Sequence, residues 1–88
     1  MARFRVYIKP SAQKDLESIP QKKERRRIVA RIERLAEDPR PRGCRKLSGR
    51  DRYRIRQGKY RILYEIENDK LAVIVVKIGH RREAYRIL

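Results

Sequence analysis

Three arginines in the segment RYRIRQGKYRILY, residues 52–64, have the side-chain type and spacing that most directly indicate chemistry. Arg54 and Arg56 alternate with apolar residues, and Arg61 follows beyond a Gly-Lys pair. Guanidinium groups bind phosphate through paired N–H donors and stay protonated throughout the physiological pH range. Their close spacing predicts a site for a ligand that carries phosphate.

The alternation around these arginines predicts a β-hairpin that holds all three on one face. Glycine suits the first central position of a type II′ turn, so we expect a two-residue turn at Gly58-Lys59. This turn places Arg56 opposite Arg61. A three-residue turn would instead mix charged and apolar side chains on both faces, because a one-residue slip reverses every side chain.

A second hairpin, with a turn at Asn68-Asp69, extends the same two faces onto a third strand. We assign one face to the core: Tyr53, Ile55, Ile62, Tyr64, Ile66, Leu71, Val73 and Val75. The other face carries the three arginines and then Leu63, Glu65, Ala72, Ile74 and Val76, with Ile78 as its last candidate. Like charges directly opposite each other destabilise a sheet, and a phosphate bound between Arg56 and Arg61 is a reason to keep both. The apolar half predicts cover by a partner chain or, alternatively, by the C-terminal tail.

The remaining elements predict one α+β domain over residues 1–88, in the order β-α-α-β-β-β. Two helices form a hairpin on one face of a mainly antiparallel sheet. Ser11 is the expected N-cap of the first helix, which stops before Pro20. The second helix carries an apolar stripe of Ile28, Ile32, Leu35 and Ala36. The expected ranges are strands at 3–8, 52–57, 60–66 and 71–78, a helix at 21–37, and a loop at 38–51.

The charge balance predicts a polyanionic partner. The 88 residues include 26 Lys and Arg against 11 Asp and Glu, a net charge of +15. Nucleic acid is the commonest partner for a chain of this kind. No apolar run is long enough to span a bilayer and no signal peptide is visible, so we expect a cytoplasmic protein without a membrane partner. Cys44 is the only cysteine, which excludes an internal disulfide and a zinc-ligand set; we expect no metal and no cofactor.

The segments LSGRDRYRIRQGKYRILYEI and VVKIGHRREAYR, together with SAQKDLESIP, resemble the RelE/ParE toxin superfamily, and its RelE branch more closely. The likeness covers nearly the whole chain. It implies a small basic ribonuclease that enters the ribosomal A site and cleaves mRNA there. It also implies a RelB-like antitoxin that wraps the toxin and blocks it.

The same resemblance implies the site residues. The basic pair of the family matches Arg54 and Arg56, and the arginine of its next strand matches Arg61. Its C-terminal basic cluster matches Arg81, with Arg82 beside it, and its late tyrosine matches Tyr85. His80 falls where relatives carry a histidine or another basic residue.

These residue types fit cleavage by attack of the RNA 2′-OH on the adjacent phosphate. Guanidinium groups stabilise the charge that develops on phosphorus, with Arg61 as the first choice and Arg81 as the next. Arginine is too basic to move protons, so His80 and Tyr85 are the candidates for that step. Alternatively, Tyr85 stacks on a base or holds the tail to the core, and His80 is a solvated residue at a strand end.

Other cations are expected to grip ribosomal RNA phosphates without reading sequence, although such residues can also form a merely solvated face. They are Arg26, Arg27, Arg31, Arg34, Arg45, Lys46 and Arg82. Two alternative functions stay open. One is a ParE-like inhibitor of DNA gyrase, and the other is an RNA-binding module without catalytic activity.

Overall fold

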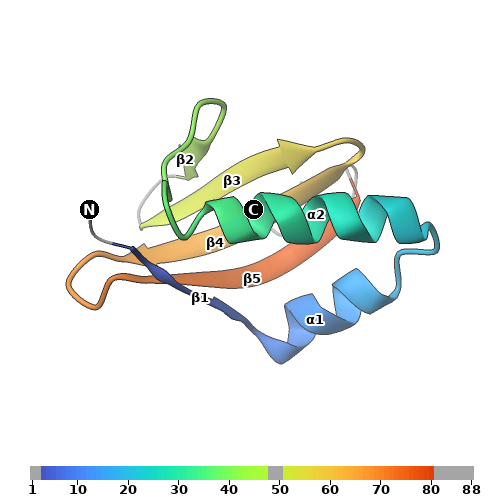
Figure 1. Ribbon diagram of the computed structural model, residues 1–88, viewed down its shortest axis with the longest axis horizontal. Helices are drawn as coiled ribbons and strands as arrows, with labels where there is room; N and C mark the ends of the chain where they lie inside the picture. The colour runs from blue at the N-terminus through green and yellow to red at the C-terminus, as the bar shows by residue number, and fades with distance from the viewer. Residues whose placement is uncertain (1–2, 48–50, 81–88) are drawn as a thin grey trace.

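Five strands form one mixed sheet in the order β1-β5-β4-β3-β2, with two helices on one face (Figure 1). The computed structural model describes residues 3–47 and 51–80. β1 runs parallel to β5, and the other neighbours are antiparallel. The elements are β1 (Arg5–Ile8), α1 (Pro10–Glu17), α2 (Lys22–Arg34), β2 (Arg45–Leu47), β3 (Arg52–Gln57), β4 (Tyr60–Glu67) and β5 (Ala72–His80). The α+β class, the helical pair and the mainly antiparallel sheet are confirmed.

The core lies between the helices and the sheet. The predicted apolar stripe begins on α2 and continues just past its end, and all of it is buried. Its exposure ranges from 0% at Ile28 to 7% at Ala36. Tyr53 and Tyr64 pair directly across β3 and β4, and their rings stack with centroids 5.8 Å apart. Of the core face assigned from the sequence, Leu71 alone lies outside the core, at 40% exposure.

The β3–β4 hairpin has the predicted register. Arg56 pairs with Arg61, Ile55 with Ile62, and Gln57 closes the turn against Tyr60. Gly58 has a φ of 59°, while no positive φ occurs at the residue after it, as a type II′ turn requires.

The β4–β5 hairpin differs from the prediction in two ways. Glu67 pairs with Ala72, so the loop has four residues, 68–71, and the register is displaced by two positions. An even displacement leaves each side chain on its expected face. A bulge then makes Val76 an extra residue, because Tyr64 pairs with Val75 while the preceding Leu63 pairs with Lys77. The bulge turns Ile78 into the core, where it is 3% exposed, rather than onto the opposite face.

Two further expectations are wrong. Ser11 is not an N-cap, because Pro10 already occupies the first helical turn and Lys9 is the cap residue. The Ser11 hydroxyl instead donates to the carbonyl of Val76 at 3.5 Å. The expected loop at 38–51 contains β2, whose three residues are too few to show a period.

An acidic side chain of α1 covers the open edge of β5 beyond the end of β1. One Asp15 carboxylate oxygen accepts the Ile78 N–H at 3.2 Å, and the other contacts the Lys77 ammonium at 3.0 Å. This contact fixes the helical hairpin against the sheet. No helix in residues 3–47 or 51–80 is long and apolar enough to cross a membrane.

Candidate nucleic-acid interface

Arginines pair with arginines at two places on the outer face, the sheet face opposite the helices. Arg56 lies directly opposite Arg61, and Arg45 of β2 lies directly opposite Arg54. Directly paired residues point to the same face, and the neighbours of these arginines in the strands face the core. The structure thus brings Arg54, Arg56 and Arg61 together as predicted, and it adds Arg45 to them. We call these four residues the arginine site.

The members of the arginine site differ in exposure. Arg56 is exposed and Arg54 is half-buried, whereas Arg61 is 3% exposed. A cavity of about 70 Å³ at the turn is lined by Arg56, Arg61 and the residues between them at 58–60. A water molecule occupies about 30 Å³ of the liquid, so the cavity has room for about two water molecules or a small group of similar size.

The next pair along the hairpin is neutral. Arg52 lies opposite Glu65, and its Nε donates to the carboxylate at 2.9 Å. The like-charge pairs that involve β3 are therefore those of the arginine site. Since opposed guanidinium groups repel each other, an anion between them stabilises the arrangement.

His80 lies on the other side of the sheet from the arginine site. It pairs with Tyr60, which packs against the core, and the two rings meet edge to face with centroids 5.7 Å apart. The bulge at Val76 is the cause, because without it the alternation of β5 would have turned His80 outward. The bulge also places Gly79 opposite Arg61, where no side chain competes for space.

The structure separates most of the other predicted RNA-binding residues from the arginine site. Arg26, Arg27 and Arg34 are exposed on α2, in the helical layer, and Arg31 is half-buried there. Lys46 pairs with Tyr53 and so lies on the helix side of the sheet.

The predicted residues Arg81, Arg82 and Tyr85 lie outside the described residues. In the ranges 3–47 and 51–80, no group of three His, Cys, Asp or Glu side chains could hold a metal ion.

A buried tyrosine anchors the segment that carries β2. The Tyr64 hydroxyl donates to the Pro39 carbonyl at 2.7 Å, and Arg40 Nε donates to the Tyr53 hydroxyl at 3.0 Å. Burial raises the pKa of the Tyr64 phenol well above its ordinary value, and the neighbouring Cys44 adds to that increase. These contacts hold β2, and with it Arg45, against β3. The sequence gives little indication that β2 is a strand, because its three residues, RKL, are few and follow a Pro- and Gly-rich stretch.

The outer face is less exposed than its composition predicts. Leu63 is 2% exposed and Ala72 is 6% exposed in the isolated chain. Burial of these two side chains therefore needs no partner chain; the alternative, cover by the C-terminal tail, falls on residues outside the described ranges and stays a prediction. Ile74 and Val76 remain half-buried.

The fold and sequence match known toxins. The family model described as the ParE toxin of the type II toxin–antitoxin system parDE matches residues 6–85. An archaeal RelE–RelB complex from Pyrococcus horikoshii contains a chain that is 32% identical, with a TM-score of 0.81, over 92% of this chain and 97% of that one. A RelB–RelE complex from Methanococcus jannaschii gives 28% identity and a TM-score of 0.73, over 93% of this chain and 98% of the other. A mutant E. coli RelE in the free state is 26% identical to this chain, with a TM-score of 0.76, over 100% of both chains.

These matches define the class as protein toxins of type II toxin–antitoxin systems. The chain belongs to the RelE/ParE toxin superfamily. No curated protein matches its sequence significantly.

Proposed function

We propose that this chain is a ribosome-dependent endoribonuclease that acts in the cytoplasm and cleaves mRNA in the A site. The observation that carries this proposal is the direct pairing of Arg56 with Arg61, which both line a cavity of about 70 Å³ at the turn. The solved structures that are more than 25% identical to this chain and cover most of it include RelE chains, which favours the RelE activity over the ParE activity.

In the proposed reaction the 2′-oxygen attacks the adjacent phosphorus while the bond from phosphorus to the 5′-oxygen breaks. The products are a 2′,3′-cyclic phosphate and a 5′-hydroxyl, and the 2′-OH proton and the proton taken up by the 5′-oxygen pass through enzyme groups or water. Arg61, with Arg81, stabilises the extra negative charge on the phosphoryl oxygens, and Arg54 and Arg56 position the phosphate. This route requires no metal ion.

Proton transfer is assigned to Tyr85 ahead of His80. The His80 ring packs on Tyr60 toward the helical layer, so it is not aimed at a phosphate held between Arg56 and Arg61. A general acid or base must come within hydrogen-bond reach of the atom it serves.

The burial of Arg61 supports dependence on the ribosome. The Arg61 residue is 3% exposed in the free chain, so its side chain has little access to free RNA. Exposed cations on α2 and on β2 bind ribosomal RNA phosphates, and the ribosome then positions the mRNA against the arginine site. The proposed inhibitor is a RelB-like antitoxin, because two of the matching structures are RelE–RelB complexes.

The test combines mapping of mRNA ends in a translation extract with a supercoiling assay on purified DNA gyrase. We expect codon-spaced mRNA cuts and unchanged supercoiling. Loss of supercoiling with intact mRNA would establish the gyrase alternative, and binding to ribosomes without either effect would establish the RNA-binding module.

Two variants localise the activity. Arg56→Ala removes an exposed side chain and keeps the fold, and Arg61→Met replaces a buried guanidinium with an apolar side chain of similar length. Arg61→Met is expected to reduce cleavage about 10²–10³-fold, as removal of one charge-stabilising donor does in other enzymes. Arg56→Ala removes a group that positions the phosphate and is expected to reduce cleavage about 10²-fold. Lys14→Ala, which removes an exposed positive charge on α1, is the matched control and should cleave normally.

A further inference from the structure

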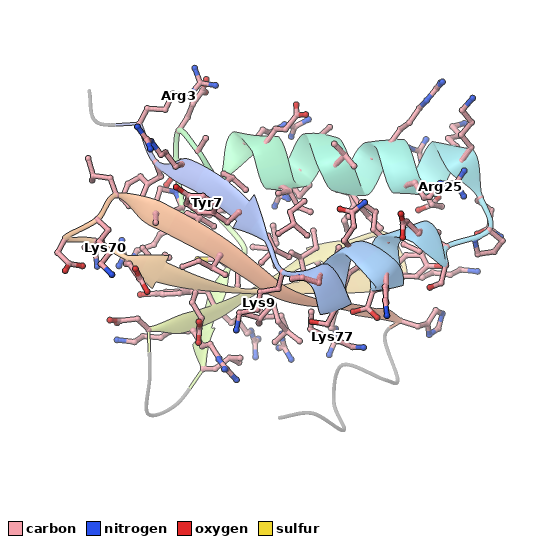
Figure 2. All side chains as sticks on the ribbon, turned by 90° about the horizontal axis from the view of Figure 1, so that it is seen from below. Arg3, Tyr7, Lys9, Arg25, Lys70 and Lys77 are labelled. Atoms are coloured by element: carbon pink, nitrogen blue, oxygen red, sulfur yellow. The ribbon has the colours of Figure 1, made fainter. Side chains whose placement is uncertain are left out.

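A cleft at the β1 end of the outer face contains two large apolar side chains that are unusually exposed. Tyr7 is 50% exposed and Leu71 is 40% exposed. The cleft, which we call the Tyr7 cleft, has a volume of about 560 Å³. Figure 2 shows Arg3, Tyr7 and Lys70 at one end of the molecule, away from Arg25 and Lys77. The lining residues are Arg3, Arg5, Tyr7, Glu67, Lys70, Leu71, Ala72 and Ile74.

Leu71 has a backbone conformation that its side chain disfavours. Its φ is 49°, and its N–H donates to the Asn68 carbonyl at 3.2 Å to close the β4–β5 loop. Glycine or asparagine adopts this left-handed conformation with less strain. Because the leucine side chain is exposed, its burial offsets little of this backbone strain. Folding alone therefore gives no reason for leucine at this position, whereas a contact outside the chain does.

Charge selects the class of partner. Arg3 and Arg5 line the cleft, and Lys70 is already paired with Glu67 at 3.7 Å. A second copy of this chain would bring the same cations and a net charge of +15 to the contact. An RNA strand could use the arginines and Tyr7, but it would make no use of Leu71. An acidic polypeptide with an apolar side chain matches both features.

We propose that the Tyr7 cleft binds an acidic segment of a partner protein, with a large apolar side chain between Tyr7 and Leu71 and carboxylates on Arg3 and Arg5. The identification of this partner as the antitoxin rests on the proposed function. Binding in the cleft does not, because none of its lining residues belongs to the arginine site.

The position of the cleft gives such a segment a route to inhibition. Pairing places Tyr7 beside Ile74, and Ile74 beside Glu65, on the same outer face as the arginine site. Glu65 lies four residues along β4 from Arg61, about 13 Å at the rise of a strand. A segment anchored in the cleft can therefore continue across the sheet and cover the guanidinium groups with its carboxylates.

The experiment measures binding of a short labelled peptide of glutamates interrupted by one leucine and one phenylalanine. The comparison probes are an all-glutamate peptide of equal length and a polyuridine strand. Amide shifts of the ¹⁵N-labelled full chain give the location of binding. We expect the mixed peptide to shift Tyr7, Leu71 and Ala72, and to bind about tenfold more tightly than the all-glutamate peptide.

Leu71→Gly is the decisive variant, because glycine suits the left-handed backbone. It should melt no lower than the wild type, bind the mixed peptide about tenfold more weakly, and keep the wild-type level of mRNA cleavage. Lys14→Ala should bind as the wild type does. Equal binding by Leu71→Gly, shifts confined to the helices, equal affinity for the two peptides, or tighter binding of polyuridine in the cleft would each overturn the proposal. Absence of cleavage by the wild type would count against the proposed function alone.

Discussion

The substitution Gly58→Ala tests the turn that aligns Arg56 with Arg61. Gly58 has a φ of 59°, where a residue with a Cβ is strained by about 1–2 kcal/mol. Alanine recovers about 0.4–1 kcal/mol, because it has less conformational freedom than glycine in the unfolded chain. A Cβ at this position would also lie 3.2 Å from Glu24 Oε2, a side chain that can rotate away. The net expectation is a loss of about 1 kcal/mol, or a melting temperature lower by about 4–8 °C.

The matched substitution is Gly43→Ala. Gly43 has a φ of 92°, and a Cβ there would meet nothing within 4 Å, so backbone strain acts without a contact. Glu24→Ala should lessen the effect of Gly58→Ala and leave that of Gly43→Ala unchanged, which a double-mutant cycle measures by thermal unfolding. Gly58→Asn should be less destabilising than Gly58→Ala, because asparagine tolerates the left-handed region. A Gly58→Ala protein more stable than the wild type, as expected where φ is negative, would refute the type II′ turn.

Two further predictions concern the anchors of β2 and β5. Tyr64→Phe leaves the Pro39 carbonyl without its donor and should destabilise the fold by about 1–3 kcal/mol, measured by urea unfolding. The pKa of Tyr64 is raised in the folded state, so the protonated phenol contributes fully to the free energy of unfolding below about pH 10. Above that pH this contribution is lost, by up to about 1.4 kcal/mol per pH unit. Tyr64→Phe should remove that part of the alkaline decline, and identical declines in the two proteins would contradict the assignment. Asp15→Ala removes the acceptor of the Ile78 N–H, so hydrogen exchange at this amide should quicken more than at Val73, and equal changes at both would contradict the edge contact.

The alternation of side chains between the two faces of a strand made the arginine hairpin predictable. An even turn at Gly58 gave one wholly apolar face and one charged face, and the structure has this register. This alternation could not determine the length of the next loop, because a four-residue loop preserves the same faces as a two-residue one. The bulge at Val76 left no mark in the sequence, since valine and isoleucine fill both faces there. That single extra residue turned Ile78 and His80 toward the helices, which is why Tyr85 is proposed ahead of His80 for proton transfer.

The length of β2 limited the rest of the site prediction. Arg45 was expected only as one of many cations on a loop, and its place opposite Arg54 depends on a three-residue strand. Contacts distant in the sequence, such as that between Tyr64 and Pro39, hold this strand in place. The burial of Arg61 also had no local signal, because alternation predicts which face a side chain occupies and not how far that face is covered.

Cleavage of a ribosome-bound mRNA with a single 2′-deoxy nucleotide at the mapped cut site tests the central claim most directly. The claim is that the arginine site supports attack by the RNA's own 2′-oxygen. We predict that the wild-type protein leaves this position intact and still cuts the all-ribose message there, with a cyclic phosphate at the new end. Cleavage at the deoxy position at the same rate would contradict the account.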